Sequence, residues 1–320
     1  MLRKIIWDLL NPRYPMIHPV HRFLMCKCLR AHGIIFMLHR VYHYEKGQLA
    51  PNEKLKVSPE YLEQTIINYK NEGFLFISLD DLARCLLTKQ FPKSPFIVMT
   101  LDDGYRDNFV NAFPIFIRHN VPFTIYITPG FIDHTVPLWW HLLEDVLISR
   151  QQQVQLSTGE LLGCETREQK EVAFMRIREQ ILKDPNVDPM SILYQLFENI
   201  DEVQASNDCH LLLNWEQIAE LSRHQLCTIG GHTMTHPPCS QLSEERFREE
   251  VCGSIQTIEA HIKKRVEHFA YPFGTKNEVG KREFELIRVF GFKTVTRVGG
   301  GVLTSWNSHS TTALPRVHLA

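Results

Sequence analysis

The sequence predicts an α/β fold in which parallel strands alternate with helices, as a (β/α) barrel or as an open doubly wound sheet. Eight short β-branched, apolar runs recur along the 320 residues, and longer helical patterns separate them. Most runs are continuously apolar, which is typical of strands buried on both faces of a parallel sheet. Their alternation with helices indicates one of these two architectures. No G-x-G-x-x-G follows the first strands, so a dinucleotide-binding fold has no support.

The predicted strands and helices follow from local patterns. The strands are 33–38, 74–78, 95–101, 121–128, 225–230, 266–272, 292–297 and 313–319. Ser58 as N-cap and Pro59 at the first helical position predict a helix that runs to about Asn71. Ser243 caps a second helix, 243–263, with acidic residues in its first turn. Its apolar residues recur every three or four positions and form one buried stripe: Phe247, Val251, Ile255, Ile258 and Ile262.

Three regions are predicted along the chain. Residues 1–32 are expected to form an N-terminal helical extension, and 33–320 the strand–helix domain. Within that domain, 134–212 break the alternation. Helical patterns lie at 139–150 and 168–183, and no strong strand pattern separates them. We therefore expect a helical insertion that covers one rim of the barrel.

Composition excludes several classes of partner. The formal net charge is −1, so nothing indicates a nucleic-acid binder that neutralises phosphates. No window reaches the length of a transmembrane helix, and the first apolar segment is too short and polar for a signal peptide. The eight cysteines are scattered without a C-x-x-C, which favours free thiols. We expect a cytoplasmic protein, with peripheral membrane contact by residues 2–10 left open.

Candidate catalytic residues follow two of the predicted strands. Asp102 and Asp103 come where a buried strand ends at Gly104, and His232 and His236 follow the strand 225–230. Because the carboxyl ends of parallel strands share one rim, these side chains are expected to converge. One carboxylate and two imidazoles, with an open position, are the ligands of a catalytic zinc site. The other carboxylate is then available to take a proton from the metal's water.

These residues carry a family resemblance. T-L-D-D-G at 100–104 resembles the T-F-D-D-G motif of the polysaccharide deacetylases, the NodB-homology group in carbohydrate esterase family four. H-T-M-T-H-P at 232–237 is similar to that family's H-[ST]-x-x-H-P, and A-Y-P-F-G at 270–274 resembles its R-x-P-Y motif. The matched region covers roughly 33–319. The resemblance implies a distorted (β/α) barrel of seven to eight parallel strands, with the helical insertion, that removes N-acetyl groups from amino sugars by metal-dependent hydrolysis.

The resemblance assigns roles to the motif residues. It implies that Asp102 is the catalytic base and that Asp103, His232 and His236 bind a divalent metal. Zn is the first expectation, with Co, Ni, Mn or Fe as alternatives. Cys239, three residues after the second histidine, is a competing soft ligand that would make a different site.

The third motif departs from the family pattern. The backbone N–H of Phe273 is expected to bind the oxyanion, and its neighbour Tyr271 to lie near the substrate. The arginine that orients the base in the family is Ala270 here, so we expect Arg316 to substitute for it or to contact the substrate.

The general acid is assigned less directly. The family's late L-x-H motif supplies it, but the residue two before His318 is Arg316 rather than Leu. His318 is the candidate acid, and His309 is the alternative. His39, in M-L-H-R-V at 37–41, follows the first strand and is expected to line the site.

The predicted function is removal of N-acetyl groups from a polysaccharide, an oligosaccharide or a glycan precursor. Trp139 and Trp140 form either a sugar-stacking platform or the core of the insertion. Two alternatives stay open. The same scaffold could hydrolyse another C–N bond, in a small or lipid-linked amide. Because the third-motif arginine is missing, it could also be a non-catalytic, metal-containing glycan-binding protein.

Overall fold

The structure is a computed structural model that describes residues 31–319, apart from 151, 184–187, 198–199, 201–207, 300, 305–306 and 308–309. The predicted N-terminal extension, 1–32, therefore lies almost wholly outside the described residues. Among the helices in the described ranges, none is long and apolar enough to cross a membrane. Five cysteines are described as free thiols: Cys85, Cys164, Cys227, Cys239 and Cys252.

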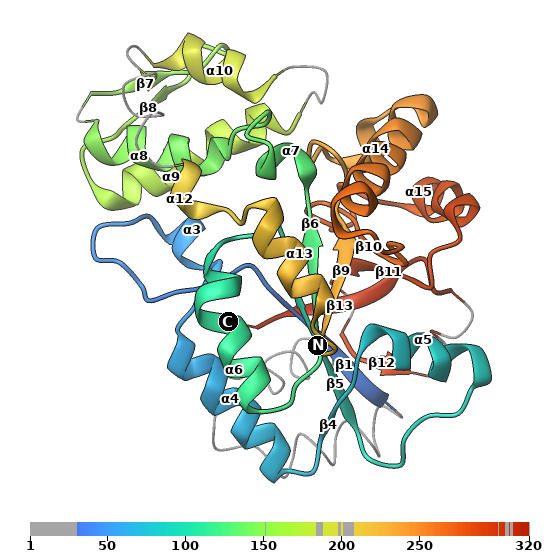
Figure 1. The fold of residues 1–320 in the computed structure, drawn as a ribbon. Coiled ribbons are helices and arrows are strands. Elements are labelled where there is room, and N and C mark those ends of the chain that lie inside the picture. Colours follow the sequence, from blue (N-terminus) through green and yellow to red (C-terminus); the bar gives the residue numbers. More distant parts are fainter. Residues whose placement is uncertain are drawn as a thin grey trace.

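Seven parallel strands close into a distorted barrel, which confirms the predicted fold (Figure 1). In order around the barrel they are β1 (Ala31–Leu38), β13 (Leu314–His318), β11 (Thr294–Val298), β10 (His268–Ala270), β9 (Cys227–Gly231), β6 (Phe123–Ile127) and β5 (Phe96–Leu101). The ring closes where β1 pairs with β5, from Gly33 opposite Phe96 to Leu38 opposite Leu101. It is weakest between β9 and β10, which pair only at Gly231 and Phe269.

Two short strands extend the barrel. β4 (Leu75–Phe76) adds parallel to the start of β5, and β12 (Leu303–Thr304) adds antiparallel to the start of β1. The predicted strand 74–78 is shortened because Ser78 caps the next helix. Its hydroxyl accepts from the Asp81 N–H, and the Asp81 carboxylate accepts from the Ser78 N–H.

The two helices predicted outside the insertion are both present, as α4 and α14. The Ser58 and Ser243 hydroxyls accept from the N–H groups of Tyr61 and Arg246, as their N-cap assignments predict. The helices outside the insertion are α3 (Ala50–Glu53), α4 (Pro59–Asn71), α5 (Leu79–Thr88), the π-helical turn η3 (Asn108–Ala112), α6 (Phe113–Arg118), α7 (Pro129–Ile132), α13 (Trp215–Arg223), the 3₁₀ turn η4 (Cys239–Gln241), α14 (Glu244–Ile262), α15 (Lys281–Leu286) and the 3₁₀ turn η5 (Ile287–Phe290). A small parallel sheet joins β2 (Arg40–Val41) to β3 (Lys56–Val57).

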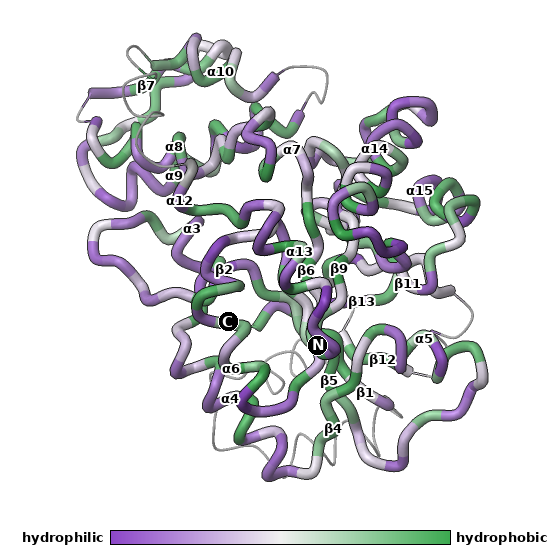
Figure 2. The backbone as a smooth tube through the Cα atoms, viewed as in Figure 1, coloured by the Kyte–Doolittle hydropathy of each residue, from purple (hydrophilic) through white to green (hydrophobic). Residues whose placement is uncertain are grey.

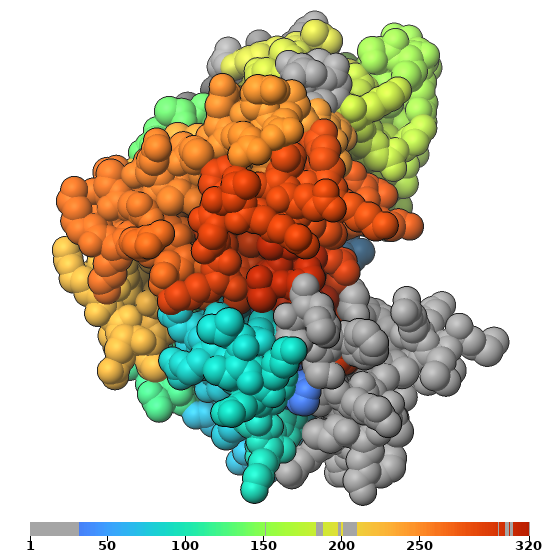
Figure 3. Space-filling model, turned by 90° about the vertical axis from the view of Figure 1, so that its right-hand side faces the viewer, coloured from blue at the N-terminus to red at the C-terminus, as the bar shows by residue number. Residues whose placement is uncertain are grey.

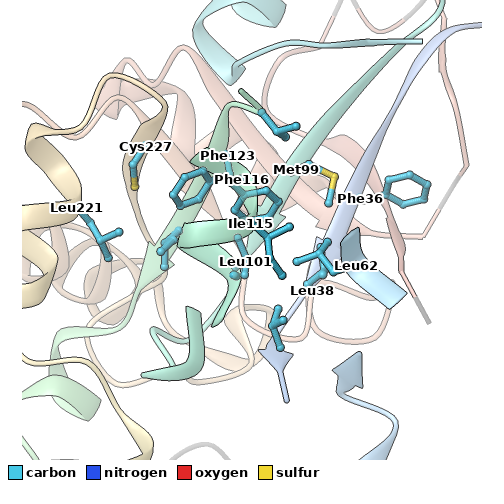
Figure 4. Packing of buried hydrophobic residues seen from close by; sticks show 14 of the residues in the cluster. Phe36, Leu38, Leu62, Met99, Leu101, Ile115, Phe116, Phe123, Leu221 and Cys227 are labelled. Carbon is cyan, nitrogen blue, oxygen red and sulfur yellow. The ribbon is translucent and has the colours of Figure 1, made fainter. Parts of the chain in front are cut away.

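The main hydrophobic core lies between the barrel and its helices. Figure 4 shows Leu38 and Leu101 from the strands beside Leu62 of α4 and Ile115 of α6. Figure 2 shows hydrophobic colouring along β4 and β5, whereas α14 and α15 alternate between hydrophilic and hydrophobic residues. This pattern agrees with strands buried on both faces and helices buried on one.

The insertion has a hydrophobic core of its own. Its elements are α8 (Trp139–Ser149), the antiparallel pair β7 (Val154–Gln155) and β8 (Leu161–Leu162), α9 (Arg167–Ile181), α10 (Pro189–Leu196) and α12 (Asp208–Leu211). Leu143, Phe174 and Leu193 pack together in this second core. Figures 1 and 3 show the insertion at the top of the molecule, above the barrel. Both long helices were predicted, but the two-strand hairpin was not.

Candidate functional site

The carboxyl end of β5 places two adjacent carboxylates in different surroundings. The Asp102 N–H donates to the Leu38 carbonyl at 3.0 Å, which holds the end of the strand in the sheet. Asp103 and Gly104 then both adopt positive φ, at 71° and 78°. A non-glycine residue in this region is strained and is held there by its surroundings. The turn directs the Asp102 carboxylate toward Arg316 and the Asp103 carboxylate toward the histidines.

The histidine loop follows β9 and is fixed by backbone and side-chain contacts. The His232 N–H donates to the Ile127 carbonyl at 3.0 Å, while the Thr128 hydroxyl donates to the His232 carbonyl at 2.9 Å. Thr233 and His236 both have a φ of 62°. The histidines thus lie in a turn whose backbone is fixed by these contacts.

Glu250 of α14 stabilises the same loop through three hydrogen bonds. Its carboxylate accepts from the N–H groups of Met234 and Thr235, at 2.9 and 2.8 Å, and from the Thr235 hydroxyl at 2.6 Å. Its side chain is almost fully buried and pairs with Arg246 at 2.9 Å. Glu250 was not among the residues predicted from the sequence. The signal was an acidic residue beside the apolar stripe of the helix at 243–263.

Asp103, His232 and His236 converge as a candidate metal centre. The Asp103 Oδ1 lies 3.6 Å from His232 Nε2 and 3.3 Å from His236 Nε2, and one ligand atom from each residue lies within 4.8 Å of the others. Ligands about 2.1 Å from a tetrahedral ion are separated by roughly 3.4 Å. The His232 Nδ1 is 2.7 Å from the Ala270 carbonyl, which orients the ring and leaves Nε2 toward the cluster.

The protonation state of the cluster also fits a metal ion. Burial lowers the pKa of His232 to about 4, so its imidazole is neutral near pH 7 and able to bind a metal. Burial raises the pKa of Asp103, but His236 and His39 outweigh it and hold that pKa below its usual range. The Asp103 Oδ1 is buried and has no hydrogen-bond partner of good geometry among the described residues. A buried, unsatisfied carboxylate oxygen between two imidazoles matches the donor set of a divalent cation.

Arg316 holds the second carboxylate. Its Nη1 and Nη2 donate to Asp102 Oδ1 and Oδ2 at 2.6 and 2.7 Å, and Nη1 also donates to the Thr100 hydroxyl at 3.2 Å. The guanidinium lies over the Tyr126 ring, 5.3 Å from its centroid. Burial raises the pKa of Asp102, yet Arg316 and His232 keep it below its usual range. The carboxylate is therefore ionised and has one fixed orientation.

The third strand end contributes a strained turn beside the cluster. Phe273 and Gly274 have φ values of 57° and 65°, and a Cβ on Gly274 would lie 2.8 Å from the Val298 nitrogen. The centroid of the Phe273 ring lies 4.7 Å from that of His236. Within the described ranges, the Phe273 N–H donates to no acceptor. This amide therefore remains available to a ligand.

Comparison with known proteins identifies the family. A family model described as polysaccharide deacetylase matches residues 89–285. The chain belongs to the polysaccharide deacetylase family. This membership supports a hydrolase that deacetylates carbohydrates. A search of curated proteins gave no match.

Solved structures share the fold. The Streptococcus pyogenes deacetylase PplD in complex with acetate aligns with a TM-score of 0.58 and 16% identity, over 89% of this chain and 91% of that chain. IcaB from Ammonifex degensii aligns with a TM-score of 0.56 and 16% identity, over 91% and 92%. A polysaccharide deacetylase from Bacillus cereus aligns with a TM-score of 0.54 and 16% identity, over 90% and 64%.

In this deacetylase fold the candidate metal centre opens into a cavity of about 550 Å³. Met37, Phe273 and Val298 line it from the barrel. His39 and His318 also line it, with ring centroids 5.8 Å apart, and the buried His39 Nδ1 has no hydrogen-bond partner within the described residues. The insertion supplies a further wall: Trp139, Trp140, Glu171, Phe174, Met175 and Arg178.

Two sequence-based candidates, Tyr271 and Cys239, lie away from the cavity, and a third is not described. Tyr271 was expected near the substrate, but it is fully buried and its hydroxyl donates to the carbonyls of Thr312 and Glu283, at 3.1 and 3.4 Å. It packs in a core behind the rim, so we exclude it from the site. Cys239 is also buried and is not part of the ligand cluster, and burial raises the pKa of its thiol. His309 lies outside the described residues.

Proposed function

We propose that this chain is a metal-dependent N-deacetylase of acetylated amino sugars. One observation carries the proposal. Asp102, paired with Arg316, and the cluster of Asp103, His232 and His236 face the same cavity. The two adjacent carboxylates thus have separate tasks. Asp103 belongs to the candidate metal centre, and Asp102 is an oriented, ionised carboxylate beside it. This division matches a hydrolysis that needs both an activated water and a base.

Asp103, His232 and His236 would hold the metal. When bound, it would supply a Lewis acid that polarises the acetamide carbonyl and lowers the pKa of water. The Asp102 carboxylate accepts the proton as the water oxygen bonds to the carbonyl carbon, and Arg316 keeps that carboxylate aligned. The Phe273 N–H donates to the carbonyl oxygen as negative charge develops there.

The second half of the reaction needs a proton on the leaving nitrogen. As the C–N bond breaks, its electron pair stays on nitrogen, and a histidine at the cavity supplies the proton. His318 and His39 both line the cavity and are the candidates that the described residues offer. Acetate and a free amino sugar then leave.

The Asp102–Arg316 pair favours an enzyme over a non-catalytic glycan-binding protein. The missing third-motif arginine was the reason for considering that alternative. Ala270 is buried in the same hydrophobic cluster as Tyr126. Arg316 lies over the Tyr126 ring and reaches Asp102 from a different strand. The base therefore has an orienting guanidinium although the motif lacks one.

Metal content and acetate release together test the proposal. Purified wild-type and His232→Ala proteins are analysed for metal, and both are assayed on N-acetylglucosamine oligomers. We expect one ion per wild-type chain, with zinc as the first candidate, and loss of both the ion and acetate release in the variant. Failure of wild-type protein to bind an ion after zinc is supplied would contradict the proposed centre. Full activity in metal-stripped protein would contradict the mechanism. The cytoplasmic location stays a prediction.

A further inference from the structure

We propose that the cavity contains an anion-binding subsite formed by Arg178 of α9, which selects acetamido sugars that carry a negative charge. The proposal deepens the proposed function and depends on it for the reaction, but binding of the charged group can be measured separately. Neither the polysaccharide deacetylase motifs nor the metal centre includes Arg178, which belongs to the insertion.

Arg178 and His236 of the candidate metal centre both lie near the Phe273 ring. Its guanidinium carbon is 5.5 Å from the centroid of the Phe273 ring, and that centroid is 4.7 Å from the centroid of His236. Arg178 also lines the cavity. A substituent on the sugar whose acetamide reaches the cluster, or on the neighbouring sugar, is therefore within range of the guanidinium.

Among the described residues, the guanidinium of Arg178 has no carboxylate partner, unlike those of the other two arginines of α9. Arg167 pairs with Glu171 at 3.0 Å, and Arg176 pairs with Glu160 at 2.8 Å. For Arg178 no carboxylate of the described residues lies within 4 Å, although Glu179 and Glu278 are near enough to affect its charge. Its side chain is half-buried, and burial lowers its pKa. A partly desolvated cation without a partner is unfavourable, and an anion in the cavity would relieve that cost.

The acidic groups near Arg178 already have other partners. Glu171 also lines the cavity, but its Oε1 accepts from the Ala50 N–H and from Arg167, both at 3.0 Å. The carboxylate of Glu278 accepts from the Thr275 hydroxyl. The cavity also has a second cation, Lys54 at the end of α3, which is exposed. Away from the metal cluster, the lining therefore favours a bound anion.

The chemistry of the guanidinium suits either a carboxylate or a phosphate. Its planar donors bind the oxygens of both groups in pairs. The anionic group would be a carboxylate on the sugar or a phosphate at its anomeric carbon, and the two sources are separated by the choice of probe.

A binding experiment tests the subsite directly. Three probes are titrated against the metal-loaded protein, with tryptophan fluorescence as the readout because Trp139 and Trp140 line the cavity. They are methyl N-acetylglucosaminide, which is neutral, N-acetylglucosamine 1-phosphate, and N-acetylglucosaminuronic acid. We expect at least one anionic probe to bind about tenfold more tightly than the neutral one. The tighter of the two identifies the source of the charge.

Variants assign that preference to Arg178. In Arg178→Gln, the Kd of the neutral probe divided by that of the anionic probe is expected to fall to about one. In Arg178→Lys, this ratio is expected to stay above one but below the wild-type value. Arg176→Gln is the matched control, because Arg176 is exposed on the same helix and does not line the cavity. If Arg178 only supported the Phe273 ring, its loss would weaken neutral and anionic probes equally and leave the ratio unchanged.

Each outcome decides one of the two proposals. Equal binding of all three probes by wild-type protein, or an unchanged ratio in Arg178→Gln, would overturn the subsite. Acetate release is measured in parallel. A preference that depends on Arg178 without acetate release from any probe would support the subsite and count against the deacetylase function. Acetate release without a preference for the charged probes would support the deacetylase function and overturn the subsite.

Discussion

The two walls of the cavity are built in different ways. On the barrel wall, Asp103, His236 and Phe273 all have positive φ, and their loops follow strands that are bonded on both sides. On the insertion wall, Trp139 and Phe174 belong to a hydrophobic core separate from the barrel's. The barrel wall is thus positioned by the backbone, whereas the insertion wall is positioned by packing between helices.

A few hydrogen bonds connect the insertion to α3, which precedes β3. Glu144 of α8 accepts from the Leu49 N–H at 2.5 Å and from the Asn52 side chain at 2.7 Å, and Glu171 of α9 accepts from the Ala50 N–H at 3.0 Å. The insertion could therefore change its cavity-facing side chains without disturbing the strand ends. Trp140 is the exception, because its Nε1 donates to the Tyr105 hydroxyl at 3.1 Å and its ring centroid lies 5.7 Å from that of His236. Under the proposed function, the chemistry would lie mainly on the barrel wall and the choice of substrate mainly on the insertion wall. Substitutions on the barrel wall should lower kcat, and those on the insertion wall should raise KM.

The largest effect is expected from Asp102→Asn on the barrel wall. The amide cannot accept the water proton, so kcat should fall by about 10²–10⁴-fold. Metal content should stay at the wild-type level, because Asp102 is not part of the ligand cluster. Acetate release and elemental analysis on the same preparation check both statements. A variant that kept the wild-type rate would remove Asp102 from the mechanism.

Arg316→Met tests how the base is held. Removal of one partner leaves the Asp102 charge buried, so we expect the free energy of unfolding to fall by about 3–5 kcal/mol. Misalignment of the base should also lower kcat by about 10²-fold. The double variant Asp102→Asn/Arg316→Met is the control. In denaturant titrations it should be more stable than Arg316→Met, because no charge is left unpaired. If Arg316→Met were as stable as wild type, the ion pair would have no structural role.

A smaller effect is expected from Glu250→Gln. The amide cannot accept all three hydrogen bonds from Met234 and Thr235, so the turn that carries His236 should loosen. Contacts of this supporting kind are typically worth about 10–100-fold in metal affinity. Metal competition titrations measure the change. Glu249→Gln is the control, since Glu249 is exposed and also pairs with Arg246. Equal metal affinity in the two variants would show that Glu250 does not hold the loop.

The residues of the barrel wall could be predicted from the sequence more completely than those of the insertion wall. The eight strand predictions correspond to β1, β4, β5, β6, β9, β10, β11 and β13, because buried parallel strands have a strong apolar pattern. Asp102, Asp103, His232 and His236 follow such strands directly, so the fold alone brings them together. Arg316 was suggested by its position near the end of the last strand, and the structure shows its bidentate contact with Asp102.

The positions of the other site residues depend on tertiary packing, which local sequence patterns do not indicate. Tyr271 belongs to the third motif, yet the alternation of side chains along the strand directs it into the core. Arg178 is one of several charged residues on an otherwise ordinary helix, and only the packing of α9 over the barrel brings it to the cavity. Glu250 resembles a surface residue in sequence because its partners are backbone N–H groups of a distant loop.

The smallest effect is expected from Trp139→Leu on the insertion wall. Leucine keeps an apolar side chain in the second core but removes the aromatic face that a sugar ring can contact. Loss of one such contact should raise KM about fivefold, with kcat unchanged within about twofold. Trp215→Leu is the control, because Trp215 stacks on His261 at 3.9 Å and does not line the cavity. A fall in kcat without a rise in KM would show that the insertion shapes the reacting geometry, and the two walls would then share one task.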